Sequence, residues 1–486
     1  MGTLSNLQPA TVFGYFEEIC KIPRVSGNEE EIIDYIVDFA EGLSLNWKRD
    51  KAGNLLVCKP ATAGLESRRT VVLQGHVDMV GDKTRNTAHD FATDPILPYI
   101  DNGWVKARGT TLGADCGIGI AAMLALLADK EAKHGAVECL FTVDEENALT
   151  GSRALAKDFF SGKILLNLDS EDDGELFIGC AGGMDTTAVL RYDIEQTPSE
   201  YVGFRITIGG LTGGHSGEDI NKGRANSIKI MSRFLWKSSG KFDFRLSAYN
   251  AGRQRNAIPR ESTVVLAICK HLKDEFRENF LRFKHDAKRE YLPVEKNICM
   301  EIEEIETPDF VIDEMTQFEL LAMLLACPSG VTRMNPDIKG LVETSTNLAV
   351  VKFSEKEITV STSQRSSAES QKTYISDMVA SLFSLTNAKI IRSNSYPAWT
   401  PNLDSEILKI TKDSYEKLFG ESPKVKVVHA GLECGLFPEK YPDLDMISFG
   451  PTIRDAHSPD ERLEIATVGK FWELLKTVLA NIPEQR

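Results

Sequence analysis

The sequence predicts a discontinuous α/β domain with a mixed, largely parallel sheet and an inserted α+β domain. Short apolar runs alternate with segments of helical periodicity up to about residue 185, as is typical of an α/β layer. Longer amphipathic strands and helices follow, and the first pattern resumes near residue 395. We therefore place one domain at residues 1–185 and 395–486, and the inserted domain at residues 186–394.

The first part of the chain has a regular order of helices and strands. Apolar residues at helical spacing predict a helix over residues 9–20, then a second one that Ser26 or Asn28 caps. β-Branched and apolar runs predict strands at residues 54–59, 70–75, 137–143 and 164–168. Further helices are predicted at residues 150–160 and, with small residues suited to close packing on a sheet, at residues 117–130.

The inserted domain has strands and helices of a different style. Strands are predicted at residues 201–209 and 262–268, with a hairpin at residues 349–362. Helices are predicted at residues 224–238, 273–291, 313–326 and 369–385. The last part of the chain returns to the α/β style, with helices at residues 404–419 and 465–482 and strands at residues 424–428 and 445–450.

Composition excludes several classes of partner. Lysine and arginine total 56 against 71 acidic residues, a net charge of −15, and no basic cluster is present. We therefore expect neither nucleic acid nor a membrane surface as a partner. No apolar run approaches the ~20 residues of a membrane span, and the start of the chain lacks a signal-peptide pattern. Nine scattered cysteines without a Cys-x-x-Cys pair predict reduced thiols in a cytoplasmic protein.

The segment around which the chain is organised is the apolar run that leads into His76-x-Asp78. Residues 71–73 form a buried strand, and Gly75 lets the backbone turn at its end. In extended geometry the side chains of His76 and Asp78 point to the same side. The imidazole can then bind a metal while the carboxylate accepts its other N–H. Alone, the same pattern also fits a surface turn.

Further candidate metal ligands follow other strands or glycine-rich turns, as active-site residues of open α/β sheets do. The candidates are His76, Asp115, the pair Glu145 and Glu146, Asp169 and His457. Two imidazoles and three carboxylates can hold two divalent ions about 3.5–4 Å apart, with one carboxylate bridging them. Adjacent Glu145 and Glu146 are not expected to ligate in the same direction, so one of them can act as a general base. Singly, each residue also fits a simpler role: a solvated helix start, an N-cap or a surface loop.

Taken in order, these motifs resemble the co-catalytic zinc peptidases, which include aminoacylases, carboxypeptidases and dipeptidases. The resemblance covers nearly the whole chain, including Gly-Gly-His215-Ser-Gly in the inserted domain. Within the group, residues 74–80 and 109–115 look most like the aminoacyl-histidine dipeptidases, also called cytosolic non-specific dipeptidases.

The resemblance implies a role for each residue of the candidate metal site. The first metal would be held by His76 and Asp169, the second by Glu146 and His457, and both by the bridging Asp115. Asp78 would orient His76, and Glu145 would be the general base. The metals would be zinc, with cobalt or manganese as alternatives. The family pattern also implies a cis peptide after the bridging residue, Asp115–Cys116, although relatives often have Asp or Asn where this chain has Cys116.

The resemblance assigns the substrate-binding residues chiefly to the inserted domain, which would act as a lid. His215 would stabilise the oxyanion, Asn256 would contact the substrate backbone, and Arg365 would clamp its C-terminal carboxylate. Gly431, near the start of the last part of the chain, would provide a backbone contact. A histidine in a glycine-rich loop and an arginine after a strand also fit a turn residue and a solvated side chain. Residues 343–347 have no chemical explanation at this stage.

The implied activity is hydrolysis of dipeptides with a free C-terminus. These include Xaa-His dipeptides such as β-alanyl-histidine, within a broad specificity. An N-acyl amino acid deacylase or a tripeptidase on the same scaffold is the nearest alternative. A metal-free binding protein, or a structural dimerisation protein, would be expected to have lost the ligands. By resemblance, we also expect a homodimer formed through the inserted domain.

Overall fold

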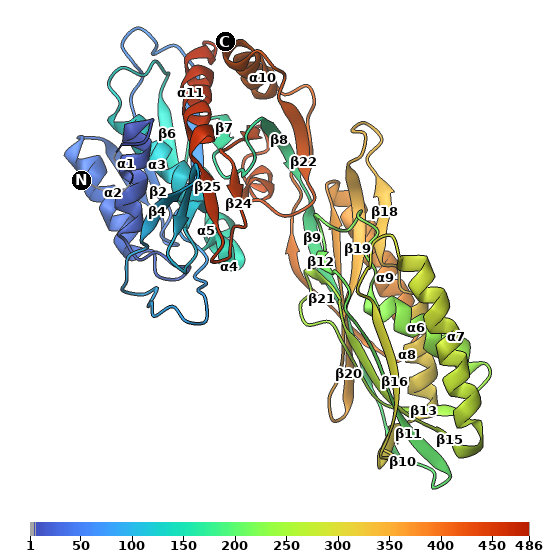
Figure 1. Cartoon of the computed structure of the whole chain (residues 1–486). Coiled ribbons are helices and arrows are strands. Elements are labelled where there is room, and N and C mark those ends of the chain that lie inside the picture. The colour runs from blue at the N-terminus through green and yellow to red at the C-terminus, as the bar shows by residue number, and fades with distance from the viewer. Residues whose placement is uncertain (1–3, 5, 486) are drawn as a thin grey trace. The chain divides into compact units, whose positions relative to one another are not determined.

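The computed structural model describes residues 4 and 6–485, which form two compact units (Figure 1). Unit 1 contains the chain up to Gly179, Pro401–Val427 and the chain from Leu432 onward. Unit 2 contains Cys180–Thr400 and the short segment Val428–Gly431. The chain therefore enters unit 2 twice, the second time for four residues only.

Unit 1 is built on an eight-stranded mixed sheet in the order β1-β2-β6-β3-β7-β23-β8-β22. The four neighbours β6, β3, β7 and β23 are parallel, whereas β1, β2 and β8 pair antiparallel with their neighbours. The strands are β1 (Asn46–Arg49), β2 (Leu55–Lys59), β3 (Val71–His76), β6 (Val137–Thr142), β7 (Ile164–Asn167), β8 (Glu175–Cys180), β22 (Lys424–Val428) and β23 (Asp445–Ser448). The predicted mixed α/β class is confirmed.

Helices of unit 1 cover this sheet. They are α1 (Ala10–Cys20), α2 (Glu30–Gly42), α3 (Ala114–Ala128), α4 (Glu145–Ala148), α5 (Thr150–Ala154), α10 (Glu406–Phe419) and α11 (Ile465–Asn481). Nearly every residue of α3 is buried, because its alanines and glycines allow close packing. The predicted capping of α2 is wrong: Glu29 is at the N-cap, and the Ser26 hydroxyl donates to Asp78 instead.

The four-stranded sheet β24-β25-β5-β4 was not predicted from sequence. Its strands are β4 (Pro98–Asp101), β5 (Trp104–Ala107), β24 (Ile453–Arg454) and β25 (Arg462–Glu464). They have two to four residues each, too few to establish an alternating pattern. β25 pairs with β5, so the C-terminal segment that follows His457 joins the first part of the chain.

The parallel strands determine where the site can form. In their register His76 pairs with Thr142, and Gln74 pairs with Asn167. The segments that follow β3, β6 and β7 therefore leave the sheet at one edge. These segments contain Asp78, Glu145, Glu146 and Asp169.

Unit 2 is an antiparallel sheet in the order β16-β11-β15-β13-β19-β20-β9-β21, with β18 paired to β19. The strands are β9 (Gly182–Arg191), β11 (Tyr201–Gly209), β13 (Phe244–Ala251), β15 (Ser262–Cys269), β16 (Cys299–Ile305), β18 (Gly330–Met334), β19 (Val342–Phe353), β20 (Glu357–Ser366) and β21 (Lys389–Tyr396). Helices pack on this sheet (Figure 1), namely α6 (Ser227–Ser239), α7 (Lys273–Tyr291), α8 (Glu314–Ala326) and α9 (Glu369–Phe383), with the short η1 (Lys270–Leu272) before α7. The hairpin β19–β20 is longer than predicted, since polar residues continue both strands beyond the apolar run.

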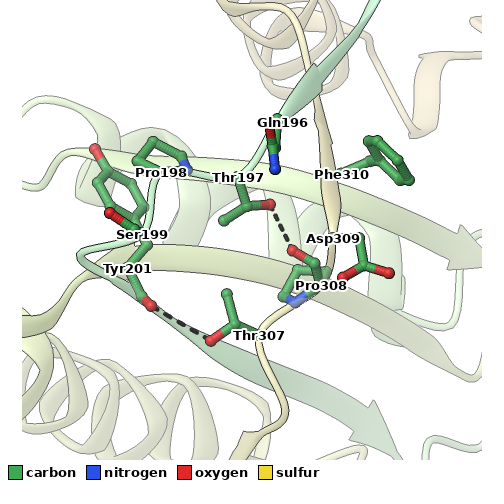
Figure 2. A pocket seen from close by; sticks show the side chains of 9 residues that line it. All are labelled: Gln196, Thr197, Pro198, Ser199, Tyr201, Thr307, Pro308, Asp309 and Phe310. Atoms are coloured by element: carbon green, nitrogen blue, oxygen red, sulfur yellow. Dashed lines mark hydrogen bonds between the residues drawn. The ribbon is translucent and has the colours of Figure 1, made fainter.

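Two small sheets complete unit 2. They are β10 (Ile194–Gln196) with β17 (Phe310–Ile312), and β12 (Gly214–His215) with β14 (Ala257–Ile258). A cavity of about 360 Å³ lies beside β10 and β17. Figure 2 shows the residues that line it, which include Thr197, Tyr201 and Phe310. No residue that the sequence assigned to a site lines this cavity.

Six of the nine cysteines are buried, and none of the nine, all in the described part of the chain, forms a disulfide. None of the helices in the described part of the chain is long and apolar enough to cross a lipid bilayer.

Candidate metal centre and anion-binding cluster

Asp115 lies between the two predicted histidine ligands in unit 1. Its Oδ1 is 3.2 Å from His76 Nε2, and its Oδ2 is 3.0 Å from His457 Nε2. The three side chains come from the N-terminus of α3, the end of β3 and the loop before β25. One carboxylate thus faces two imidazoles with separate oxygens, which is the arrangement a bridging metal ligand requires.

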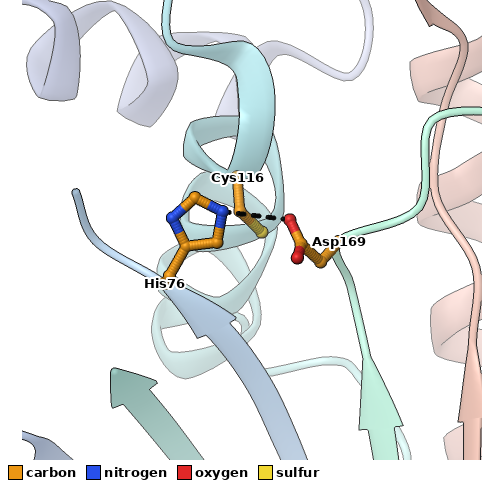
Figure 3. A group of neighbouring side chains, drawn as sticks. All are labelled: His76, Cys116 and Asp169. Atoms are coloured by element: carbon orange, nitrogen blue, oxygen red, sulfur yellow. Dashed lines mark ion pairs between the residues drawn. The ribbon is translucent and has the colours of Figure 1, made fainter. Parts of the chain in front are cut away.

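His76 is the centre of the first group of ligand atoms. Its Nε2 is also 3.2 Å from Asp169 Oδ1, and its Nδ1 is 3.4 Å from Asp78 Oδ1. Figure 3 shows the side chains of His76, Cys116 and Asp169 directed toward one another, with Cys116 at the start of α3 and an ion pair between His76 and Asp169. The Cys116 sulfur also lies within 4.8 Å of ligand atoms of His76 and Asp169. The predicted cis peptide at Asp115–Cys116 is confirmed.

Glu145 and Glu146 both face this centre. Glu146 Oε1 lies 3.0 Å from His457 Nε2, and each glutamate has an oxygen within 4.8 Å of a nitrogen of His76. Both side chains therefore reach the same centre, but among the described ion pairs only that of Glu146 involves an imidazole. Asp78 accounts for this geometry, because its two carboxylate oxygens accept the backbone N–H groups of Glu145 at 3.1 Å and Glu146 at 3.2 Å.

Burial and like charge perturb the acids of this centre. Burial raises the pKa of Asp169 to about 8, with His76 opposing the shift and Asp115 adding to it. Burial likewise raises the pKa of Glu145 well above its usual range; His76 opposes this, while Asp169 and Glu146 add to it. Two carboxyl groups whose pKa values are raised mark a cluster with more negative charge than its imidazoles balance.

The imidazoles respond in the opposite sense. Hydrogen bonds to Asp115 and Glu146 raise the pKa of His457 to about 11. Burial disfavours the charged form of His76, but Asp169, Asp115 and Asp78 raise its pKa well above the usual value. These shifts are the response of two imidazoles that lie among several acidic side chains.

The donor set of this cluster fits a pair of divalent cations. Glu146 Oε1 and Asp169 Oδ1 are buried, and each faces one imidazole nitrogen, His457 Nε2 at 3.0 Å and His76 Nε2 at 3.2 Å. Among the described side chains, no lysine or arginine forms an ion pair with Asp78, Asp115, Glu145, Glu146 or Asp169. Imidazole nitrogens and carboxylate oxygens are the ligands that zinc and neighbouring metals prefer.

A second cluster lies wholly within unit 2, around Arg365 on β20. Its Nη1 donates to the Tyr396 hydroxyl at 2.8 Å, and its Nη2 is 3.4 Å from His215 Nε2. Arg365 is only 7% exposed, and no described carboxylate forms an ion pair with it, while its Nε has no acceptor among the described residues. A buried guanidinium without a counter-ion is expensive unless an anion can join it.

The environment of His215 sets its tautomer. The backbone N–H of Glu218 donates to His215 Nδ1 at 3.3 Å, so in the neutral ring the proton is on Nε2. Burial, and then the charge of Arg365, lower the pKa of His215 to about 4, which keeps the ring neutral. The Nε2–H of His215 and an N–H of Arg365 therefore meet without an acceptor between them.

The stretch at residues 343–347, left without explanation above, organises this cluster. It forms the start of β19, where Ser345 pairs with Arg365 and its hydroxyl contacts His429 Nε2 at 2.8 Å. The Asn347 amide donates to the Ala257 carbonyl at 2.8 Å, which holds the loop containing Asn256. Burial, then Arg365 and His215, lower the pKa of His429 to about 3.

Gly431 and Asn256 are placed differently from the other predicted residues. A Cβ at Gly431 would lie 2.8 Å from the Tyr396 ring, so the glycine leaves room for Tyr396. The Asn256 side chain is exposed, and its backbone carbonyl accepts from Ser216 N at 2.8 Å. Sequence reasoning missed Tyr396 and Ser345, because only the strand register brings them to Arg365.

Comparisons with known proteins agree with this geometry. The model of Peptidase family M20/M25/M40 matches residues 72–481. The Escherichia coli (strain K12) cytosol non-specific dipeptidase is 42% identical over 483 residues, covering 99% of this chain and 100% of the relative. The crystal structure of aminoacylhistidine dipeptidase from Vibrio alginolyticus superposes with a TM-score of 0.91 at 44% identity, covering 99% of each chain.

A more distant structure shares only the fold. An aminopeptidase from Bacillus cereus ATCC 10987 has a TM-score of 0.58 at 14% identity, over 98% of this chain and 99% of its own. The family model covers most of the chain, and the relative from Escherichia coli matches it from end to end. The chain therefore belongs to Peptidase family M20/M25/M40.

Proposed function

We propose that this protein is a metal-dependent dipeptidase of broad specificity that accepts Xaa-His dipeptides such as β-alanyl-histidine. The observation that carries the proposal is the placement of Asp115, whose two oxygens face His76 and His457 separately. The similarity to dipeptidases from Escherichia coli and Vibrio alginolyticus supports a dipeptide as the substrate.

Five residues would hold two divalent ions, most simply zinc, with cobalt or manganese as alternatives. His76 and Asp169 would hold one ion, Glu146 and His457 the other, and Asp115 both. When bound, such ions supply Lewis acidity and a nucleophile at neutral pH. Asp78 would keep the ring of His76 and the backbone of both glutamates in place, as its contacts with them suggest.

Glu145 would act as the general base. It faces the centre without an imidazole contact as short as that of Glu146, so its carboxylate is free to accept a proton from the attacking water. It would then deliver that proton to the leaving amine. Asp78 fixes the backbone of Glu145, which limits the directions in which the carboxylate can move.

The cluster in unit 2 would bind the substrate as an anion. Arg365 would pair with the C-terminal carboxylate, since the guanidinium is buried, unpaired and has free N–H groups. His215 would donate its Nε2–H to the oxyanion that forms at the scissile carbonyl. Asn256 and Gly431 would contribute contacts to the substrate backbone.

A substrate panel tests the proposal. Metal-loaded protein should hydrolyse Xaa-His and other dipeptides, and metal analysis should find two ions per chain. Preference for tripeptides or for N-acetyl amino acids would instead assign a tripeptidase or a deacylase on the same scaffold. A metal content of zero with no turnover would indicate a binding protein.

Location and assembly are part of the same proposal. We assign the protein to the cytoplasm, following the name of the Escherichia coli relative and the reduced thiols. We assign unit 2 to substrate binding and to a homodimer, the latter by resemblance alone. Light scattering after size exclusion measures the assembly, and the mass of a single chain would contradict the dimer.

A further inference from the structure

A buried carboxylate outside the proposed ligand set holds the loop that carries Asp115. Glu461 is 2% exposed, and its two oxygens accept the backbone N–H groups of residues 112–114 at 2.7, 2.9 and 2.8 Å. A longer contact of 3.4 Å reaches the N–H of Asp115 itself. One side chain therefore satisfies the N–H groups of a whole turn, in the way a capping residue does.

Arg24 holds the same loop through a carbonyl. Its guanidinium, 2% exposed, donates to the carbonyl of Gly113 at 2.5 Å and to those of Val77 and Asp78 at 2.8 and 2.9 Å. A Cβ at Gly113 or Gly117 would lie 2.6 Å from Arg24 Nη2, so both positions must lack a side chain for this contact to form. The loop of Asp115 is thus tied to the segment of Asp78 by Arg24.

Glu461 also belongs to the segment that carries the other histidine. It follows His457 by four residues and immediately precedes β25, which is paired to β5. Because Asp115 Oδ2 lies 3.0 Å from His457 Nε2, any shift between their two loops would separate the candidate ligands. Glu461 is the side chain that links these two loops directly.

We propose that Glu461 is a positioning residue that sets Asp115 against His457 and so preforms the site of the metal that His457 binds. The inference rests on the proposed metal-dependent function. In this role Glu461 contacts neither metal nor substrate and only sets the spacing of the two ligands Asp115 and His457. Residues that orient metal ligands are typically worth about 10- to 100-fold in metal affinity.

The test is metal binding by Glu461→Gln. The substitution keeps the size of the side chain but turns an amide donor toward backbone N–H donors. Metal-depleted protein is titrated with cobalt(II), followed by absorption and by calorimetry, and separately with zinc. We expect one of the two ions to bind about 10- to 100-fold more weakly than in the wild type. Activity then falls because the site is half filled, and it recovers as free metal is raised.

Glu138→Gln is the matched control. Glu138 is also a buried carboxylate of unit 1 that accepts backbone N–H groups, those of Ser161 at 2.8 Å and Gly162 at 2.8 Å. It lies on β6 four residues before Thr142, the residue paired with His76, and so away from the ligands. Its loss should lower the unfolding temperature without changing either metal affinity.

The outcomes separate this inference from the proposed function. Wild-type affinity for both ions in Glu461→Gln overturns the positioning role and leaves the metallopeptidase proposal standing. Failure of the wild type to bind metal removes both. If Glu461→Gln does not fold, Arg24→Lys tests the same loop. The single ammonium of lysine replaces two guanidinium nitrogens, of which one contacts Gly113 and the other the segment of Val77 and Asp78. Unchanged metal affinity in that variant would then overturn the inference.

Discussion

Replacing Arg365 should selectively destroy recognition of a free C-terminus. In the structure one of its N–H groups is used by Tyr396, while Nη2 faces a ring N–H of His215 and Nε has no acceptor among the described residues. Of the five N–H groups of the guanidinium, four therefore remain, and a bidentate pair with a carboxylate uses two of them. At about 1.5–3 kcal/mol for each hydrogen bond to a charged group, Arg365→Ala should cost about 3–6 kcal/mol.

That energy corresponds to about 10²- to 10⁴-fold in kcat/KM at 1.4 kcal/mol per factor of ten. The assay compares a dipeptide with its C-terminal amide. For the wild type the free acid should be the much better substrate, and in Arg365→Ala the two should become similar. Arg365→Lys should recover part of the loss, because it restores the charge without the planar fork.

The control is Arg245→Ala in the same unit. Arg245 is equally buried, at 7% exposed, but it pairs with Glu195 and Glu314. Its loss should lower stability and leave the preference of acid over amide unchanged. If Arg365→Ala lowers kcat/KM by the same factor for the acid and for the amide, Arg365 does not bind the C-terminal carboxylate.

Three further perturbations follow from the same geometry. Glu145→Gln should lower kcat by about 10²- to 10⁴-fold while both metals stay bound; loss of a metal would make Glu145 a ligand. Tyr396→Phe removes one partner of Arg365, at about 0.5–1.5 kcal/mol, so KM for free-acid dipeptides should rise more than kcat falls. Tyr192→Phe, which loses a hydroxyl contact with a carbonyl elsewhere in unit 2, should change neither constant. The unfolded ring of His215 takes a proton near pH 6.5 and the folded ring only near pH 4, so the folded state loses stability as pH falls through that window. The stability lost over that pH range is about 3 kcal/mol at 1.36 kcal/mol per pKa unit. In His215→Gln, the free energy of unfolding measured with denaturant should depend less on pH between 6.5 and 4. The same pH dependence in this variant and the wild type would contradict the prediction.

The parts of the fold and site that the sequence predicted are those with local causes. β3, β6 and β7 are largely apolar, and an aspartate lies two residues after the end of each, so the ends of the strands could be predicted from the sequence. Parallel pairing then brings those ends to one edge of the sheet. The convergence of His76, Asp169 and Glu146 therefore follows from the predicted α/β fold class. The turn before Asp115 was equally predictable from the sequence, since glycines lie on both sides of it.

Features that depend on long-range pairing were not predictable from one sequence. Ser345 lies opposite Arg365 only because β19 has a particular register against β20. Ser26 has the residue type of a helix cap, yet its hydroxyl donates to Asp78 at 2.7 Å, so a tertiary contact replaces the local one. Glu461 and Arg24 likewise act on a loop some 350 and 90 residues away, as the separations of their contacts show.

Each cluster has an excess of charge that its own unit does not neutralise. In unit 1, five acidic side chains surround two imidazoles, and the described part of the chain pairs no lysine or arginine with them. In unit 2, a buried guanidinium and a ring N–H meet without an acceptor. Both arrangements are costly in the absence of ligands, because burial weakens the solvation of each charge. In the proposed function, divalent cations would relieve the first excess and a peptide carboxylate the second. A metal-dependent enzyme with an anionic peptide as its substrate would therefore account for both imbalances together, whereas a purely structural role would account for neither.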